Sequence, residues 1–295
     1  MRKLPNKNPM ENKKIRTIRI LAASVFVVCM ILTGWEYGQS LRHRAQQDSL
    51  KEMTDETAVK DQMESGSVLK DTGVATLSDP GTEHARDSGE QDEGTTKNTA
   101  AQEPAMLDRY VELYAENNDL AGWLSIAGMK IDYPVMQNED DEYYLHRDFY
   151  GNDSKYGCLY VRARADLDTG TNFIVYGHNM KDGAMFGDLD SYLEKSFYEK
   201  HSLISFHTLY EERVYEIIAV FRSQVYNTDD DVFKYYQFYE ADTQEDFDSF
   251  YNNIKELSLY DTGVEARFGD TFLTLSTCAY HVKDGRLVVV AKRVA

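Results

Sequence analysis

The chain has no Phe, Tyr or Trp between Tyr37 and Tyr110, whereas nearly all of its aromatic residues lie from Tyr110 onward. A stretch without aromatic side chains cannot bury enough apolar surface to offset the entropy lost on ordering. We therefore expect a disordered tether at residues 37–105. It precedes one globular domain at residues 106–295, about 190 residues and enough for a hydrophobic core.

Charge is distributed as unevenly as the aromatic residues. Seven basic residues against Glu11 give residues 1–19 a net charge of +6, so the total of −18 leaves −24 for the rest of the chain. Nucleic-acid binding requires a basic surface that neutralises phosphates. The composition therefore excludes nucleic acid as a partner of the domain.

Residues 20–35 carry no charge and directly follow the basic residues. We interpret residues 20–36 as a transmembrane anchor. A cleaved signal peptide has the same basic and apolar parts, but no small-residue cleavage site follows here. The excess of positive charge predicts a single-pass protein of the cell membrane, with a cytoplasmic tail at residues 1–19 and an extracellular tether and domain.

The domain shows eight short segments typical of strands, several of them alternating and bounded by Gly, Asp or Asn. They span residues 123–128, 130–136, 158–164, 173–178, 203–209, 214–223, 271–277 and 286–294. This pattern predicts a mainly β fold, a closed or nearly closed eight-stranded β-barrel.

Helices are expected at three places in the domain. Apolar residues at helical spacing predict one helix from Leu107 to about Asn117 and another at residues 247–257. Residues 185–201 read as a third helix. Asp242, followed three residues later by Glu245, predicts a capping box for the helix at residues 247–257.

The three cysteines, Cys29, Cys158 and Cys278, are too widely spaced to suggest a disulfide framework or a zinc site. Cys29 falls in the apolar segment, and Cys158 begins an apolar strand, as a buried cysteine does. Cys278 ends a strand, where its thiol can face a cleft and react as a thiolate beside a cation. We therefore select Cys278 as the candidate nucleophile.

Two further residues suit acyl transfer. His178 closes a strand and is positioned to donate and accept a proton at a rim, although His281 competes as the base because it lies three residues after Cys278. Arg286 opens the strand that returns after Cys278, so a hairpin brings its guanidinium near the sulfur, where it suits an oxyanion. Spacing alone leaves the choice between these histidines open.

Three segments together resemble the sortases, the cysteine transpeptidases of Gram-positive bacteria. They are T-L-S-T-C at residues 274–278, G-R-L-V-V at residues 285–289 and F-I-V-Y-G-H-N at residues 173–179. Residues 133–151 followed by Y-G-C-L-Y, and a long helix before the cysteine strand, resemble class B in particular. The resemblance implies an eight-stranded sortase barrel with an added N-terminal helix.

The resemblance also implies roles for individual residues. Cys278 would be the nucleophile, His178 the general acid and base, and Arg286 the group that stabilises the substrate and the intermediate. Ser276 and Leu145 would bind substrate. The chain departs from the family pattern at two positions. Asp141 stands where many relatives have Asn, and Ala279 follows the cysteine where an acidic residue is common.

The implied reaction cleaves a C-terminal sorting motif after its Thr, holds the protein as a thioester and transfers it to an amine. The expected partners are surface proteins that carry sorting signals, and the peptidoglycan or its lipid-linked precursor; no cofactor is expected. The alternatives are a pilus-polymerising class B sortase, an envelope cysteine hydrolase and a peptide-binding module without catalysis.

Overall fold

The computed structural model describes residues 9–68, 104–279 and 282–295. The chain divides into two units, Met1–Leu50 and Lys51–Ala295. The basic tail is thus described only from residue 9, and residues 69–103 of the expected tether lie outside the described residues.

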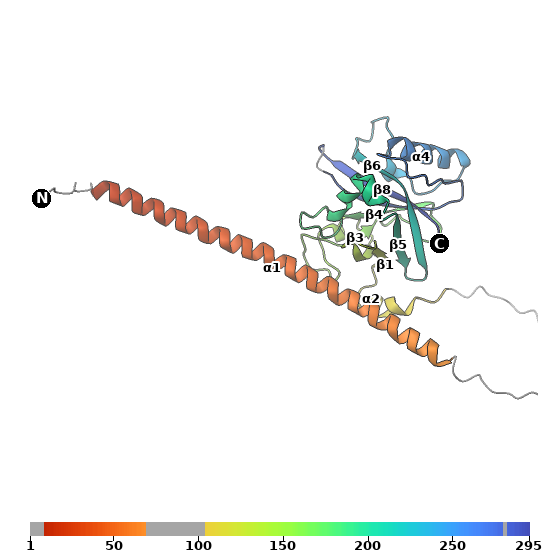
Figure 1. The fold of residues 1–295 in the computed structure, drawn as a ribbon, viewed down its shortest axis with the longest axis horizontal. Coiled ribbons are helices and arrows are strands. Elements are labelled where there is room, and N and C mark those ends of the chain that lie inside the picture. Colours follow the sequence, from red (N-terminus) through yellow and green to blue (C-terminus); the bar gives the residue numbers. More distant parts are fainter. Residues whose placement is uncertain (1–8, 69–103, 280–281) are drawn as a thin grey trace, which may run out of the picture. The chain divides into compact units, whose positions relative to one another are not determined.

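The first described element is a long helix, α1, at Pro9–Val68 (Figure 1). Within the described residues it is the one helix long and apolar enough to cross a membrane, over Arg16–Asp55. Side chains of its apolar segment, such as Phe26 and Leu32, are exposed. The apolar helix is therefore a candidate membrane anchor.

The helix differs from the expected tether, because residues 38–68 are helical as well. The missing aromatic residues argue against an independent core there, but they do not exclude a helix. Residues 45–64 are rich in Gln, Lys, Glu, Met and Ala, which have high helix propensity.

In the described part of the domain, eight strands form a closed barrel in the order β1-β2-β3-β4-β7-β8-β6-β5, as predicted. The strands are β1 (Leu120–Ser125), β2 (Asp132–Gln137), β3 (Leu159–Val161), β4 (Asn172–Gly177), β5 (Leu203–Thr208), β6 (Glu212–Gln224), β7 (Phe272–Cys278) and β8 (Gly285–Arg293). Pairs β2–β3 and β4–β7 are parallel, and the others are antiparallel. Each of the eight predicted segments contains or overlaps one of these strands.

Six helical elements lie in the described part of the domain, and all except the first and the last are single short turns or 3-10 helices. They are α2 (Asp108–Glu116), η1 (Tyr143–Leu145), η2 (Gly187–Leu193), α3 (Lys195–Tyr198), η3 (Tyr235–Gln237) and α4 (Gln244–Leu257). The helices α2 and α4 confirm two predictions. The single helix predicted at residues 185–201 is wrong: the segment is divided into the 3-10 helix η2 and the single turn α3.

The predicted capping box of α4 is displaced by one residue. Thr243, and not Asp242, is the N-cap, and its side chain accepts a hydrogen bond from the backbone N–H of Asp246 while the Asp246 carboxylate bonds back to the cap. Both pairs have the same three-residue spacing and acceptable residue types. The sequence pattern therefore could not separate the two registers.

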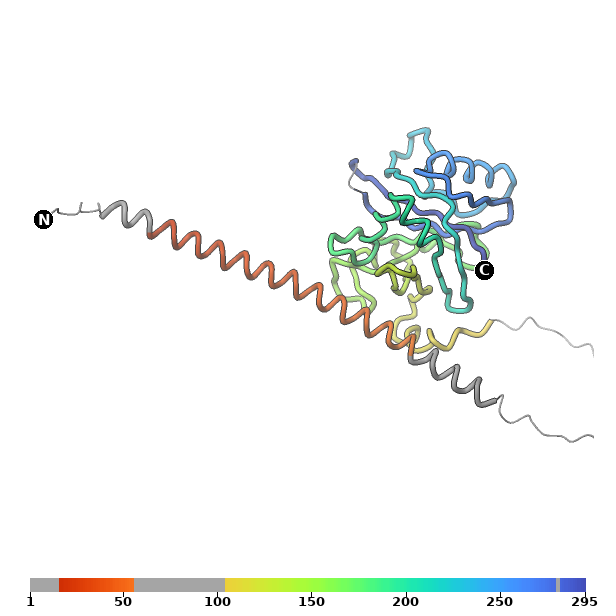
Figure 2. The backbone as a smooth tube through the Cα atoms, in the orientation of Figure 1, coloured from red at the N-terminus to blue at the C-terminus, as the bar shows by residue number. Residues whose placement is uncertain are grey.

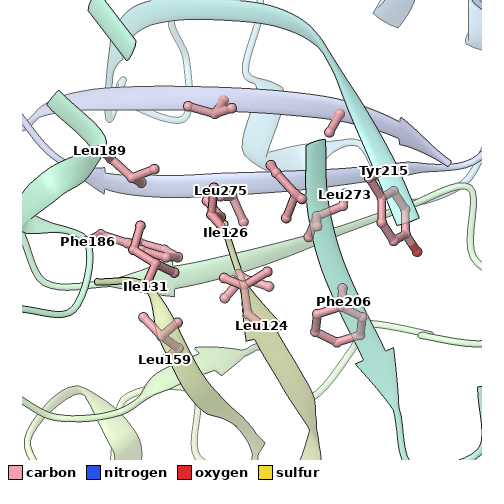
Figure 3. Packing of buried hydrophobic residues seen from close by; sticks show 14 of the residues in the cluster. Leu124, Ile126, Ile131, Leu159, Phe186, Leu189, Phe206, Tyr215, Leu273 and Leu275 are labelled. Carbon is pink, nitrogen blue, oxygen red and sulfur yellow. The ribbon is translucent and has the colours of Figure 1, made fainter. Parts of the chain in front are cut away.

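The core consists of two layers. Inside the barrel, residues such as Leu124, Phe206 and Leu275 are fully buried and point toward one another (Figure 3). Outside it, α4 packs Phe250 and Ile254 onto the outer face of β4, β6, β7 and β8. Figure 1 shows α4 beside β6 and β8.

The backbone trace shows how distant segments become neighbours (Figure 2). The strands β4 and β7 pair in parallel, although β5, β6 and α4 lie between them in sequence. The C-terminal ends of these two strands therefore meet at one edge of the barrel.

Candidate active site

Cys278 is the last residue of β7 and lies directly opposite Arg286 in the antiparallel pair with β8. Residues opposed in this way have Cβ atoms about 4.5–5.5 Å apart and face the same side of the sheet. The Cys278 side chain is partly exposed. The hairpin thus places a thiol and a guanidinium next to each other, as the sequence predicted.

His178 lies at the same edge of the barrel as Cys278, because β4 and β7 pair in parallel. Gly177 of β4 pairs with Thr277 of β7, so the next residue of each strand, His178 and Cys278, emerges at the same edge. The following residue adds a direct link, because Asn179 Nδ2 donates a hydrogen bond of 3.0 Å to the backbone oxygen of Cys278. The histidine loop and the cysteine strand are therefore fixed to each other.

A cavity of about 490 Å³ opens at this edge. All five residues selected from the sequence line it: Cys278, His178, Arg286, Ser276 and Leu145. Its other lining residues are Asp141, Glu142, Tyr160, Arg162, Tyr176, Gly177, Val225, Tyr235, Tyr236 and Thr277. The cavity thus brings together a thiol, an imidazole and a guanidinium, the kinds of group that acyl transfer needs.

The imidazole of His178 is held at the cavity wall by the 3-10 turn η1. Its Nε2 lies 2.8 Å from the backbone oxygen of Leu145, the last residue of that turn. The ring of His146, an exposed residue, lies with its centroid 6.2 Å from that of His178. Leu145 therefore contributes a backbone carbonyl to the site as well as its side chain.

Ser276 is only 1% exposed, yet it borders the cavity. Its hydroxyl shares a hydrogen bond of 2.7 Å with the Tyr235 hydroxyl, contributed by η3. Burial raises the pKa of Tyr235 to about 12, so the phenol keeps its proton at neutral pH. Sequence reasoning missed Tyr235, which lies in a connection without a recognisable motif.

Arg162 brings a second guanidinium to the cavity and was also missed. Its Cζ lies 5.1 Å from the centroid of the Tyr176 ring, and its Nε lies 3.7 Å from Asp141 Oδ2. The other oxygen of Asp141 accepts a hydrogen bond of 2.8 Å from the backbone N–H of Ala163. The acidic residue that departs from relatives is thus paired with a cation in the cavity wall.

The other cysteines have different surroundings. Cys158 is 3% exposed, and burial raises the pKa of its thiol, which opposes formation of the reactive thiolate. It does not line the cavity. Cys29 lies in α1 and is exposed. The prediction that Cys158 is a core residue agrees with its burial.

The other histidines do not replace His178 in the described part of the chain. His201 Nδ1 bonds to the backbone oxygen of Ala127, and His207 Nδ1 bonds to the Tyr110 hydroxyl. His281, the competing base, lies outside the described residues. Within residues 16–55, 104–279 and 282–295, no group of three or more His, Cys, Asp or Glu side chains is arranged to hold a metal ion.

Comparison with known proteins gives consistent matches to this domain. The family model described as the sortase domain matches residues 124–294. The protein named sortase B in Listeria monocytogenes is 36% identical over 194 residues, which cover 64% of this chain and 75% of the relative.

Solved structures give the same result. A crystal structure of sortase B from Bacillus anthracis has a TM-score of 0.58 and 33% identity, covering 65% of this chain and 88% of that one. A Staphylococcus aureus sortase B–substrate complex has a TM-score of 0.58 and 31% identity, covering 64% of this chain and 86% of that one. The family match at residues 124–294 includes every residue that lines the cavity.

Proposed function

The chain belongs to the sortase family as a class B sortase, a cysteine transpeptidase, and we propose that Cys278, His178 and Arg286 carry out its reaction. The observation that carries this assignment is their convergence on one cavity: a hairpin joins Cys278 to Arg286, and the parallel pairing of β4 with β7 brings His178 to them from a distant part of the sequence. The substrates are proteins that carry a sorting signal, in agreement with the substrate complex of the S. aureus relative.

In the first half of the reaction, the Cys278 thiolate attacks the carbonyl carbon of the Thr in the sorting motif. The carbonyl electron pair moves to the oxygen, and the Arg286 guanidinium stabilises the oxyanion. The intermediate collapses as the C–N bond breaks and His178 protonates the departing amine. The substrate is then held on Cys278 as a thioester.

In the second half, an amine of a cell-wall peptide or its lipid-linked precursor attacks the thioester carbonyl. His178 accepts the proton that the amine loses, and Arg286 again stabilises the oxyanion. Breaking the C–S bond releases the Cys278 thiolate and forms the new amide. Charge and protons return to their starting positions, so no cofactor is needed.

Substrate binding is assigned to the remaining lining residues. The Leu145 side chain offers apolar surface, and Ser276 offers a hydroxyl that is already oriented by Tyr235. Arg162 and Asp141 form a charged pair along the same wall. A peptide that occupies the cavity therefore meets apolar, hydroxyl and ionic groups together.

The proposed arrangement along the chain follows the sequence analysis. Residues 1–19 form a cytoplasmic tail, residues 20–36 cross the membrane once, and residues 106–295 form the catalytic domain outside the cell. The exposed apolar helix and the excess of positive charge before it support this orientation. Residues 37–105 connect the two.

Mass spectrometry of reaction products tests the function directly. The full chain is incubated with peptides that carry candidate sorting motifs, with and without an added glycine-peptide amine. Transpeptidation gives a product joined to the amine after the Thr, and Cys278→Ala gives none. Release of hydrolysis product at a rate unaffected by the amine would instead identify a cysteine hydrolase.

A further inference from the structure

The contact between His178 and the η1 turn determines which ring nitrogen carries a proton. His178 Nε2 lies 2.8 Å from the backbone oxygen of Leu145. A carbonyl oxygen only accepts hydrogen bonds, so Nε2 must be the donor. In the neutral imidazole the other nitrogen, Nδ1, then carries the lone pair.

We infer that the Leu145 carbonyl holds His178 in the Nε2–H tautomer, and that Gly157 is the positioning residue that keeps this carbonyl in place. The inference rests on the proposed function of His178 and extends it to a single atom. Proton exchange with the amine and the sulfur uses Nδ1, while Nε2 stays bonded to the protein throughout.

The turn that carries the carbonyl is fastened to the segment before β3. The backbone N–H of Cys158 donates to the oxygen of Tyr144, and that of Ser154 donates to the oxygen of His146, each at 2.9 Å. These bonds flank Leu145 on both sides. The position of its carbonyl is therefore set by how closely the two segments approach.

Gly157 lies at the point of closest approach. Its φ of +59° is in the left-handed region, and a Cβ built there would lie 2.7 Å from the Leu145 oxygen and 2.6 Å from the Tyr144 oxygen. Both are backbone atoms, which cannot rotate away as a side chain does. A side chain at Gly157 must therefore displace the carbonyl that orients His178.

The chain supplies a matched control. Gly263 also has a left-handed backbone, with a φ of +75°, but nothing lies within 4 Å of a Cβ built there. Gly157→Ala and Gly263→Ala thus impose the same kind of backbone strain. Only the first one pushes on the Leu145 carbonyl.

The first measurement is the tautomer of His178 in the full-length protein labelled with 15N-histidine, with its signals assigned by their loss in His178→Gln. Two-bond 15N–1H correlations identify the protonated nitrogen once the ring is neutral. We expect protonated Nε2 and unprotonated Nδ1. A ring protonated at Nδ1 would overturn the inference, whatever the activity of the enzyme.

The second measurement compares the variants in transpeptidation. We expect Gly157→Ala to lower kcat between about 10-fold and 100-fold with little change in KM, because it misplaces the base and not the substrate. Its His178 signals should show a loss of the pure Nε2–H form. Gly263→Ala should keep kcat and tautomer, and Leu145→Ala, which retains the carbonyl, should keep the tautomer while raising KM.

The outcomes separate the two proposals. Gly157→Ala with unchanged kcat and an unchanged tautomer would overturn the positioning role. If that variant does not fold, the tautomer of His178 in the unmodified chain and in Leu145→Ala tests the role of the Leu145 carbonyl. A ring protonated at Nδ1 in either protein would overturn it. An Nε2–H tautomer combined with full activity of His178→Ala would leave the carbonyl contact standing and refute the catalytic role of His178.

Discussion

The side-chain amide of Asn179 donates a hydrogen bond to the backbone carbonyl of Cys278, with Nδ2 and the oxygen 3.0 Å apart. This bond joins the residue after His178 to the residue that carries the sulfur. It continues the β4–β7 pairing beyond the last paired positions, Gly177 and Thr277. The relative position of the proposed base and the proposed nucleophile therefore depends on a side chain as well as on the sheet.

Replacing Asn179 with Asp tests this dependence. A carboxylate can donate neither to this carbonyl nor to Asp190 Oδ2, which lies 3.3 Å from the same nitrogen. The variant therefore loses hydrogen bonds worth about 1 kcal/mol each and adds repulsion between acceptors. We expect kcat of transpeptidation to fall about 10-fold, with a smaller change in KM. The steady-state rate of product formation measures both constants.

A second asparagine serves as the control for that change. Asn253 Nδ2 donates in the same way to a backbone carbonyl, that of Ser249 on α4, at 2.7 Å. Asn253→Asp should cost similar stability without slowing turnover. Equal losses of kcat in both variants would show that the effect is general destabilisation and not placement of the site.

Much of the barrel was predictable because strand patterns are local. Residues 214–223 and 286–294 alternate or form apolar runs that indicate strands without knowledge of their partners, and both became strands of the closed barrel. Helical propensity is also local, but residues 38–68 were predicted to be a tether although they are helical. Residues 185–201 were predicted to be one continuous helix although they form two short ones.

The site was predictable only in part, because its geometry is not local. Cys278 and Arg286 are joined by a hairpin, so their proximity followed from their spacing. His178 lies 100 residues before Cys278 and was selected over His281 by resemblance, since spacing left both open. Nothing in the sequence pointed to Arg162 or Tyr235, because the connections that place them in the cavity have no motif.

Thiol labelling should distinguish the two cysteines of the domain. Cys278 is partly exposed, whereas Cys158 is 3% exposed and burial raises the pKa of its thiol. Brief treatment of the folded protein with iodoacetamide should modify Cys278 and leave Cys158 intact, as read by peptide mass mapping. Cys278→Ala should lower turnover at least about 1,000-fold while the thermal transition is retained.

The same labelling in denaturant supplies the reference, because both cysteines should then react. Preferential labelling of Cys158 in the folded protein, together with activity that survives Cys278→Ala, would contradict the assignment of the nucleophile.

The hydrogen bond between Ser276 and Tyr235 can be tested by a double-mutant cycle. Both residues are at least 98% buried and their hydroxyls lie 2.7 Å apart. Either Ser276→Ala or Tyr235→Phe leaves one hydroxyl without this partner, so each should lower the free energy of unfolding by about 1–2 kcal/mol. The double variant should lose less than the sum, as measured by denaturant unfolding.

Additive losses in that cycle would mean that the two hydroxyls do not stabilise each other. Steady-state kinetics of the two single variants test the proposed role of Ser276 in substrate binding. This role predicts a higher KM for Ser276→Ala than for Tyr235→Phe.

The domain boundary predicts how the chain tolerates shortening. Residues 106–295 should stay soluble, unfold in one transition and process free peptides at the rate of the full chain. Residues 124–295 should not, because they lack Leu120–Trp123 of β1, which pairs with both β2 and β5, and the buried Tyr110 and Leu113 of α2. A stable, active product from the shorter piece would contradict this boundary.

Replacing Arg286 with Lys separates charge from geometry. Arg286 Nη1 donates to the backbone oxygens of Gly285 and Asp284, at 3.0 and 3.3 Å, and this contact directs the guanidinium. A lysine keeps the positive charge but loses the planar fork that can bond to the backbone and to an oxyanion at once. We expect kcat to fall between about 10-fold and 100-fold, with KM changed less, because the oxyanion exists only after attack.

The same substitution at the other end of β8 provides the comparison. Arg293 pairs with Glu211 and does not line the cavity, so Arg293→Lys should leave turnover unchanged. If Arg286→Lys raised KM at constant kcat, the guanidinium would serve only to bind the peptide. If it changed neither constant, positive charge alone at this position would satisfy the reaction, and the planar fork of Arg286 would have no catalytic role.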